Sequence, residues 1–475
     1  MISVCHAKKK ALKEHFRVPS PFCRKDPVSA FFYCEHEQEQ KRECMITTGG
    51  RGVDPIHSRG SYADFKDLWL LKGGSSPDSF EWSAIQGKGI EGTQVKSKSS
   101  PPPRDQSAGG ATQEAFYLFG GYQTSGSEYK GDLWQLDLKK IGKASMWRSL
   151  DIEVANMPTS RYAHNLIATP NNEILIWGGY NSSSLCDPRL WRLNTSTIPT
   201  EEEYWQEFPH EPDDPIPLPA FTDGAKFPGA CRVSAAADYA ILPTGEEVMA
   251  VFGGRQKHVK FYDELWFYHL SNNSWVRAGA SGGAGNASSP AAATGPTPSP
   301  RDHATLTFVR EAAALYLFGG RAQNLSAVLN DLWRYSLAAG TWTRLAPGGA
   351  PPPPRQRHSA VAWHRNLGPV GGEDPDPPRP DSLGNASVLV FGGEAFVPDQ
   401  DNVPVKGLND LHLYLVGADR WVELSRSRCE LDLEALVAPG GLSRSRVLII
   451  AVVLGAAVLL AAAICVSCYF CWKPR

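Results

Sequence analysis

The chain has 475 residues and a formal net charge of -2, and 42% of its residues are hydrophobic. A chain of this size can bury a large core, and its 44 glycines and 37 prolines indicate many turns. The nearly neutral charge offers no basic surface, so we expect no nucleic-acid partner. The weak helical periodicity argues against an α/β protein.

Residues 1–18 are predicted to form a basic, disordered segment. Five basic residues lie between Lys8 and Arg17, and no apolar run follows them. A secretory signal peptide needs such a run, so none is visible here.

Residues 19–425 are predicted to hold six repeats. In each repeat an apolar run ends in two glycines, a Leu-Trp or Leu-His pair follows, and a further Trp closes the unit. The glycine pairs are Gly49 and Gly50, Gly120 and Gly121, Gly178 and Gly179, Gly253 and Gly254, Gly319 and Gly320, and Gly392 and Gly393. The leucine is followed by Trp69, Trp134, Trp191, Trp266, Trp333 or His412, and the closing residues are Trp82, Trp147, Trp205, Trp275, Trp342 and Trp421. Recurring units of several short strands predict a radially repeated all-β fold.

The fifth repeat shows the expected strands most clearly. Residues 315–318 form a continuous apolar run, which suits a strand buried on both faces. Residues 331–335 and 341–345 alternate more openly, and residues 301–308 would supply a fourth strand. One unit is therefore predicted to be a four-stranded antiparallel sheet that needs neighbours on both faces.

This pattern resembles the kelch motif, whose family forms β-propellers. The motif opens on arginine, assigned here to Arg24, Arg104, Arg161, Arg232, Arg301 and Arg355, with a full Arg-x-x-His at Arg161 to His164 and at Arg355 to His358. Two units depart from the motif. In the first, the residues before the glycines are Met-Ile-Thr-Thr (45–48), and in the sixth, His412 replaces Trp. The resemblance implies a six-bladed propeller whose atypical units meet at ring closure.

Alignment of residues 19–32 with later openings predicts that the first blade borrows no strand from the C-terminal end. The ring would then be held by side-chain packing or by a disulfide between its ends. Cys429 with Cys5 or Cys23 could form that bond, and unpaired thiols are the alternative.

Two groups of segments are predicted to emerge on one face of the ring, which we call the loop face. They are the Pro- and Gly-rich inter-blade segments 86–103, 208–229, 278–300 and 346–354, and the loops 122–131 and 394–408 between second and third strands. We expect flexible rims here, because such runs cannot build a core of their own. Binding sites on rigid scaffolds usually lie in loops, and unselected spacers are the alternative.

Catalytic, cofactor and metal sites are not predicted. His164, His303 and His358 are assigned to equivalent blade positions, which favours repeat architecture over metal ligation. Cys34 and Cys44 fall at strand ends, where a cross-strand disulfide or simple thiols are expected. Enzymes resembling kelch proteins include a copper radical oxidase and sugar isomerases, but no matching Tyr, Cys and His set is found. The aspartates before the Leu pairs, Asp67, Asp132, Asp331 and Asp410, are expected to be hydrogen-bonding residues of the repeat.

The C-terminal end carries a predicted transmembrane helix. The stretch from Val447 to Cys468 is apolar and uncharged, long enough to cross a hydrocarbon core of about 30 Å. We place a juxtamembrane linker at residues 426–446, the helix at residues 447–472 and a short basic tail at residues 473–475. Three cysteines, Cys465, Cys468 and Cys471, could be palmitoylated or could be ordinary small residues of the helix.

Two signals in the sequence disagree about the side of the membrane on which the propeller lies. The absence of a signal peptide describes a tail-anchored protein with a cytosol-facing propeller. Six Asn-x-Ser/Thr sequons, where about two would arise by chance, favour an extracytoplasmic propeller whose start has been truncated or misassigned. They lie at Asn181, Asn194, Asn272, Asn286, Asn324 and Asn385. On that reading, Cys186 and Cys231 are predicted to form a disulfide between adjacent blades.

The sequence therefore predicts a non-enzymatic, membrane-anchored propeller that binds a protein or glycan ligand through its loop face. An adhesion role fits the same description. The alternatives are a propeller enzyme, such as an oxidase or a glycan-acting protein, and a cytosol-facing tail-anchored scaffold.

Overall fold

The chain divides into two compact units, Met1–Arg426 and Ser427–Arg475. The computed structural model describes parts of the first unit, and the account below concerns these residues. They are residues 21, 23–35, 41–53, 62–73, 80–86, 100–141, 146–150, 157–181, 189–196, 205–208, 232–256, 260–278, 296–323, 328–364, 386–395 and 407–426.

Five separate four-stranded antiparallel sheets follow one another along the chain, and we call them blades 1 to 5. Each is a meander whose strands pair in chain order. Blade 1 is β2 (Val28–Glu35), β3 (Lys41–Thr48), β6 (Leu68–Lys72) and β7 (Glu81–Gln86); blade 2 is β8 (Ala108–Ala111), β9 (Ala115–Phe119), β12 (Leu133–Asp137) and β13 (Trp147–Ser149). Blade 3 is β15 (Asn165–Ala168), β16 (Glu173–Trp177), β18 (Leu190–Asn194) and β19 (Trp205–Phe208). Blade 4 is β20 (Ala236–Ile241), β21 (Glu247–Phe252), β24 (Leu265–His269) and β25 (Ser274–Arg277); blade 5 is β27 (Thr305–Val309), β28 (Ala314–Phe318), β30 (Leu332–Ser336) and β31 (Thr341–Leu345).

A last meander has the same pairing order within a larger sheet. Its strands are β33 (Ser359–His364), β34 (Ala386–Gly393), β35 (Leu408–Leu415) and β36 (Arg420–Ser425). The same eight-stranded sheet includes β1 (Arg24–Lys25), β4 (Arg51–Val53), β5 (Tyr62–Asp64) and β32 (Gly348–Gly349).

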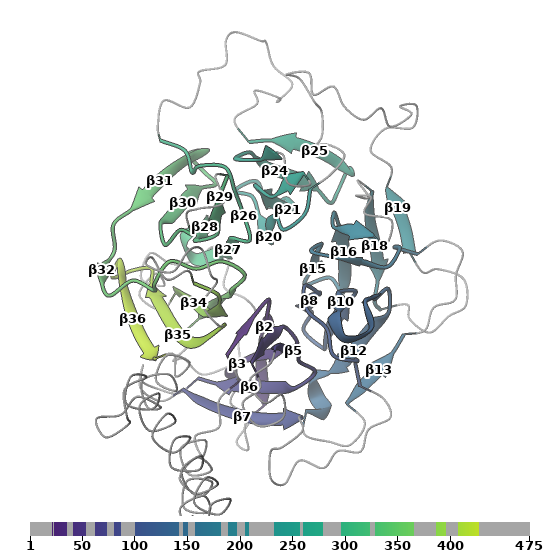
Figure 1. Cartoon of the computed structure of the whole chain (residues 1–475). Coiled ribbons are helices and arrows are strands. Elements are labelled where there is room, and N and C mark those ends of the chain that lie inside the picture. The colour runs from purple at the N-terminus through teal and green to yellow at the C-terminus, as the bar shows by residue number, and fades with distance from the viewer. Residues whose placement is uncertain are drawn as a thin grey trace, which may run out of the picture. The chain divides into compact units, whose positions relative to one another are not determined.

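The first strands of these meanders contact one another in a closed cycle, β2 to β8, β15, β20, β27, β33 and back to β2. Figure 1 shows β2, β8, β15, β20 and β27 around the centre, with the last strands β7, β13, β19, β25, β31 and β36 at the outside. This arrangement is a β-propeller, as the repeats predicted. Every first strand lies on the inside, so residues at its start meet near the ring axis.

The core lies between the sheets. The middle strand β28 is buried along its whole length, as its apolar run predicted. Its Leu317 packs with Leu265 of blade 4 and Trp333 of blade 5 in one apolar cluster. Similar clusters fill the interface between each consecutive pair of sheets, including that between blade 1 and the last meander. The stacking therefore buries both faces of the central strands, which a single sheet cannot do.

A buried arginine joins the strands of each blade. In blade 5, Arg301 donates two hydrogen bonds to the carboxylate of Asp331, at 2.6 and 2.9 Å, and one to the carbonyl of Gly319 at 3.0 Å. The Trp333 indole N–H donates to the same carboxylate at 2.6 Å. Equivalent arginine–acid pairs are Arg24–Asp67, Arg104–Asp132, Arg232–Glu264 and Arg355–Asp410. In blade 3 the acid is replaced by Arg189, whose guanidinium lies over Trp191, and Arg161 donates to Gly178 and Thr159.

The glycine pairs are the joints between neighbouring sheets. Gly319 and Gly320 have φ of 63° and 96°, a region that costs other residues strain. The Gly320 N–H donates to the carbonyl of Arg355, the opening arginine of the next sheet, at 2.9 Å. A Cβ on Gly319 would lie 2.8 Å from that same carbonyl oxygen. Glycine is thus required both by the turn and by the close approach of the next sheet.

The other five glycine pairs adopt the same turn. Both members of every pair have positive φ: Gly49 and Gly50, Gly120 and Gly121, Gly178 and Gly179, Gly253 and Gly254, and Gly392 and Gly393. In blades 2, 3 and 4 the second glycine is also the joint itself, because its N–H donates to the opening arginine of the next blade. These bonds run from Gly121 to Arg161, from Gly179 to Arg232 and from Gly254 to Arg301. In blade 1 the N–H of Gly50 donates to the carbonyl of Arg104 in the same way, at 3.0 Å.

Two expectations need correction. Residues 301–308 are not one strand, because His303 has a φ of 52° and separates β26 (Arg301–Asp302) from β27. The inter-blade segment 346–354 is not merely a flexible rim, because β32 pairs in parallel with the outer strand β36. That pairing occupies an edge that would otherwise be open.

Ring closure uses backbone and side-chain contacts. Blade 1 is built from residues 28–86 alone, and β1 pairs with β35 of the last meander at Arg24 and Leu408. The Asp26 N–H donates to the carbonyl of Arg357 at 2.8 Å, and the Asn409 side chain donates to the carbonyl of Pro21 at 3.1 Å. Cys5 and Cys429 lie outside the described residues, so the predicted staple between the ends stays a prediction.

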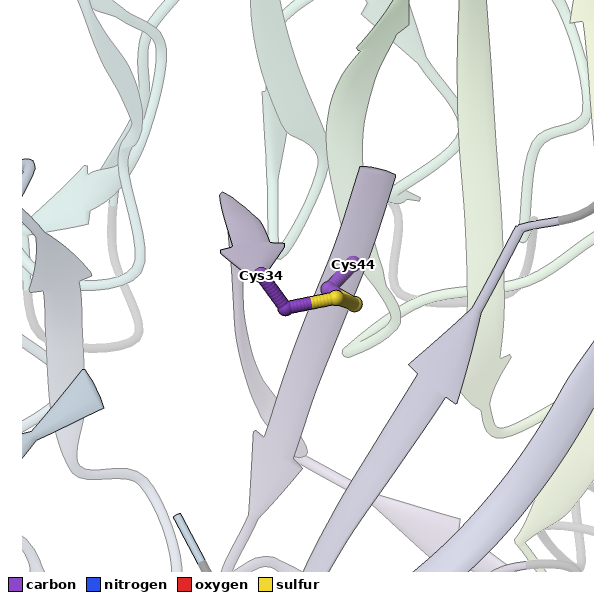
Figure 2. The surroundings of a disulfide bond; sticks show 2 residues. All are labelled: Cys34 and Cys44. Carbon is purple, nitrogen blue, oxygen red and sulfur yellow. A yellow bond between two sulfur atoms is a disulfide. The ribbon is translucent and has the colours of Figure 1, made fainter. Parts of the chain in front are cut away.

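Cys34 and Cys44 form the cross-strand disulfide that was one of two expectations for them (Figure 2). Their Cα atoms are 5.9 Å apart, within the usual range for a disulfide. Cys23 is disulfide-bonded as well.

The predicted helix at residues 447–472, its linker and its tail lie outside the described residues. Within the part that is described, the helices are three-residue 3-10 turns, and none could span a membrane.

Loss of the acid from one arginine pair should destabilise the propeller. Asp331→Asn leaves the guanidinium of Arg301, 1% exposed, without its carboxylate, and we expect a loss of about 3 kcal/mol. Asp137→Asn is the control, because Asp137 pairs with Lys140 at the surface and its loss should cost less than about 1 kcal/mol. Chemical denaturation of both variants measures the difference. Equal stability of the two would contradict the role assigned to the pair.

Candidate functional site

The starts of the inner strands form a rim on the loop face, within the ring of sheets. Short pairings build it: β14 (Arg161–Tyr162) with β17 (Tyr180–Asn181), β26 with β29 (Arg321–Ala322), β10 (Tyr122–Gln123) with β11 (Glu128–Tyr129), β22 (Arg255–Gln256) with β23 (Lys260–Phe261), β1 with β4, and β4 with β5. Single bridges add Asp105 to Tyr122, Val233 to Arg255 and Gln356 to Glu394. Each sheet therefore presents a short row of side chains from the residue after its opening arginine and the residue after its glycine pair.

A collar of six residues in left-handed conformation surrounds the axis. It consists of the second residue after each opening arginine, with φ between 49° and 57°: Asp26, Gln106, Ala163, Ser234, His303 and Arg357. Backbone hydrogen bonds link the collar from blade to blade, for example His303 N–H to Ser234 at 2.9 Å and Arg357 N–H to His303 at 3.1 Å. Left-handed conformation at non-glycine residues costs energy and persists where the surroundings enforce it.

The collar corrects one expectation about histidine. His164 and His358 occupy the third position after their arginines, whereas His303 occupies the second and belongs to the collar. His164 and His358 pack edge-on against Phe119 and Phe318 of the preceding blades. Burial lowers the pKa of each to about 3, so both are neutral packing residues. Among the described residues no group of side chains could hold a metal ion.

Ion pairs link most of the rim. Asp302 of blade 5 binds Arg255 of blade 4 at 2.8 Å and Arg321 at 2.6 Å. Burial alone would raise the pKa of Asp302, but His303 and Arg321 hold it well below its usual range. Across ring closure, Arg357 pairs with Asp26 at 3.0 Å and Lys25 with Glu394 at 3.3 Å. Within the last repeat, Arg357 also pairs with Glu394 at 3.3 Å.

Blades 2 and 3 present tyrosines instead. Tyr122 and Tyr129 are opposite one another in β10 and β11, with ring centroids 5.1 Å apart. Tyr162 of blade 3 lies 6.1 Å from Tyr122 and 5.6 Å from Tyr129, and its partner Tyr180 lies 6.0 Å further on. We call these four residues the tyrosine cluster. Tyr122, Tyr129 and Tyr162 are half-buried, so the cluster keeps an accessible aromatic surface.

Asp105 lies beside this cluster. Its backbone exchanges two hydrogen bonds of 2.9 Å with Tyr122, which puts the two side chains on the same face. The residue is 2% exposed, and its Oδ1 has no hydrogen-bond partner among the described residues. Burial, followed by the charges of Asp26 and Asp64, raises its pKa to about 7, against the opposing effect of Arg51 and Arg357.

The opposite end of the ring holds a pocket of about 410 Å³ between blades 3 and 4. Its polar groups bind one another: Arg192 donates to Glu173 at 2.6 and 2.9 Å, and Asn171 donates to Glu247 at 2.9 Å. A pocket whose charged side chains are already paired has less to offer a ligand than the tyrosine cluster and the unpaired Asp105 of the rim.

Three of the six sequons fall on described residues. Asn194 and Asn272 are exposed near the turns between third and fourth strands, at the end of the blades away from the rim. Asn181 follows Tyr180 at the rim and is half-buried. Asn286, Asn324 and Asn385, and the predicted disulfide between Cys186 and Cys231, lie outside the described residues.

The comparisons with known proteins agree with the repeats. The family model described as the KLHDC2/KLHL20/DRC7 Kelch-repeats domain matches two overlapping stretches, residues 222–376 and 286–430. Together the two stretches span residues 222–430, less than half of the chain. Outside these stretches, the same arginine pairs and glycine joints recur in blades 1 and 2 of the propeller.

Two curated proteins are similar to parts of this chain. One is the leucine-zipper-like transcriptional regulator 1 homolog of Drosophila melanogaster, 30% identical over 118 residues, which are 25% of this chain and 10% of that protein. The other is tip elongation aberrant protein 1 of Schizosaccharomyces pombe, 28% identical over 229 residues, which are 47% of this chain and 16% of that protein. The similarity thus spans less than a fifth of either relative's length.

Ionisation of the Asp105 carboxyl should lower the stability of the folded protein as pH rises. Its raised pKa means that the folded state holds this proton between about pH 4 and pH 7 while the unfolded state has lost it, so stability falls as pH rises through that range. We expect the stability of Asp105→Asn relative to wild type to rise by on the order of 2 kcal/mol between pH 4 and pH 8. Thermal unfolding at both pH values measures this. A difference that is independent of pH would show that Asp105 is an ordinary ionised carboxylate.

Proposed function

We propose that this chain is a non-enzymatic protein-binding module that takes its partner on the loop-face rim. The observation that carries the proposal is the contrast around the rim, where ion pairs link most of the charged residues and blades 2 and 3 offer a tyrosine cluster. Tyrosine is enriched at protein interfaces, because its ring buries a large area and its hydroxyl remains able to hydrogen-bond. The kelch-repeat match supports a protein partner over the glycan ligand considered from sequence.

We further infer that the ring has six blades, with the β33–β36 meander as the sixth. The closed cycle of first-strand contacts supports this count, as does the apolar cluster between that meander and blade 1. A closed ring of this kind holds the rim residues of all blades at fixed positions. Rigid positioning lowers the entropy lost on binding.

Display on a membrane is part of the proposal. It is supported by the apolar sequence from Val447 to Trp472, which would anchor the chain as a single-pass protein. An extracytoplasmic propeller is supported by the six sequons and by the Cys34–Cys44 disulfide, since disulfides persist in oxidising compartments. A tail-anchored protein with a cytosol-facing propeller is the alternative.

Partner capture tests the binding site. Affinity capture from the protein's own cells should recover a partner with the wild type and lose it with the double variant Tyr129→Ala, Tyr162→Ala. Tyr33→Ala is the matched control, because Tyr33 is 44% exposed near the far end of β2 from the rim. A partner that is retained equally by both variants would place the interface elsewhere.

Glycosidase treatment tests the compartment. The full-length protein extracted from membranes should shift to lower mass after removal of N-linked glycans, and Asn272→Gln should reduce that shift, because Asn272 is exposed. An unchanged mass in protein that remains with the membrane fraction would favour the cytosol-facing alternative.

A further inference from the structure

The tyrosine cluster forms one aromatic surface across two blades. The register of β10 with β11 and of β14 with β17 sets two tyrosine pairs side by side, and Tyr162 lies within about 6 Å of both rings of the blade 2 pair. The faces of aromatic rings carry negative potential and attract cations. Three of the four rings are only half-buried, so this potential is accessible from solvent.

One carboxylate of the described rim, that of Asp105, has no ion-pair partner there. Among the described rim residues, Asp26 pairs with Arg357, Asp64 with Arg51, and Glu394 with Lys25. Asp302 binds two arginines. Asp105 forms no ion pair in the described part of the chain, and its Oδ1 accepts no hydrogen bond there.

We propose that the tyrosine cluster and Asp105 together bind an arginine or lysine side chain of the partner protein. The guanidinium or ammonium group would lie against the tyrosine rings and supply the buried carboxylate with the ion pair that it lacks. This inference rests on the proposed function and names the chemistry of its ligand.

The site favours a cation over other occupants. An anionic side chain would be repelled by Asp105, because Asp26 and Asp64 nearby are already paired with Arg357 and Arg51 and Asp105 is not paired. An apolar side chain could pack on the rings but would leave the carboxylate buried without a partner, which is unfavourable. A long side chain with a terminal positive charge satisfies both the rings and Asp105.

Binding of short peptides to the full-length protein tests the inference. Degenerate libraries of end-blocked peptides with a fixed central Arg, Lys, Gln or Glu are compared by fluorescence anisotropy. We expect the Arg and Lys libraries to bind about tenfold more tightly than the Gln library, and the Glu library to bind most weakly.

Two isosteric variants on blade 2 separate a specific site from general electrostatics. At pH 8, above the pKa of Asp105, Asp105→Asn and Glu128→Gln each remove one negative charge, but the Glu128 side chain is 60% exposed and pairs with Lys130. We expect Asp105→Asn to abolish the preference for Arg and Lys, and Glu128→Gln to keep it. Both variants are first checked for wild-type thermal unfolding or better.

The outcomes separate the inference from the proposed function. Equal binding of the Arg, Lys and Gln libraries, or an equal effect of the two variants, would overturn the cationic ligand while partner capture through the tyrosines still stood. Absence of peptide binding would overturn it as well. Retention of the captured partner by the tyrosine double variant would contradict the proposed function itself.

Discussion

The buried arginine that opens each repeat is the contact on which the propeller depends. Its side chain holds the glycine turn of its own blade, and in five of the six described repeats it also binds the acid before the Leu pair. In five of the six described repeats its backbone carbonyl accepts the N–H of the previous blade's second glycine, as Arg355 does from Gly320. One residue therefore fixes the fold within a blade and the spacing between blades. A buried ion pair of this kind is favourable because nearly all of its hydrogen-bonding groups are used.

That arrangement leaves the next residues of each blade free to differ. The residue after the arginine and the residue after the glycine pair face the rim, and they are Tyr162 and Tyr180 in blade 3 but Asp302 and Arg321 in blade 5. Stability comes from the blade interiors, so the rim can carry a costly residue such as the unpaired Asp105. Residues that weaken a fold are commonly retained where they serve binding.

The sequence predicted the sheets because their signals are local. The apolar run of β28 and the glycines at its end specify a buried strand and its turn without reference to distant residues. The bidentate role of Asp331 was only partly anticipated, since its arginine lies thirty positions earlier in the chain. The tyrosine cluster was missed because Tyr122 and Tyr162 come together only when two blades stack. The residue after each opening arginine was the available signal, and comparing it across the repeats would have singled out Asp105 and Tyr162.

The central claim is that a rigid propeller binds its partner on the rim of blades 2 and 3. Hydrogen exchange of the full-length protein with and without the captured partner tests this claim most directly, because it reports every backbone amide at once. The account predicts new protection at residues 105–106, 122–130, 161–163 and 179–181, with blade interiors unchanged. Protection confined to the turns at the opposite end, such as residues 270–274, would contradict it.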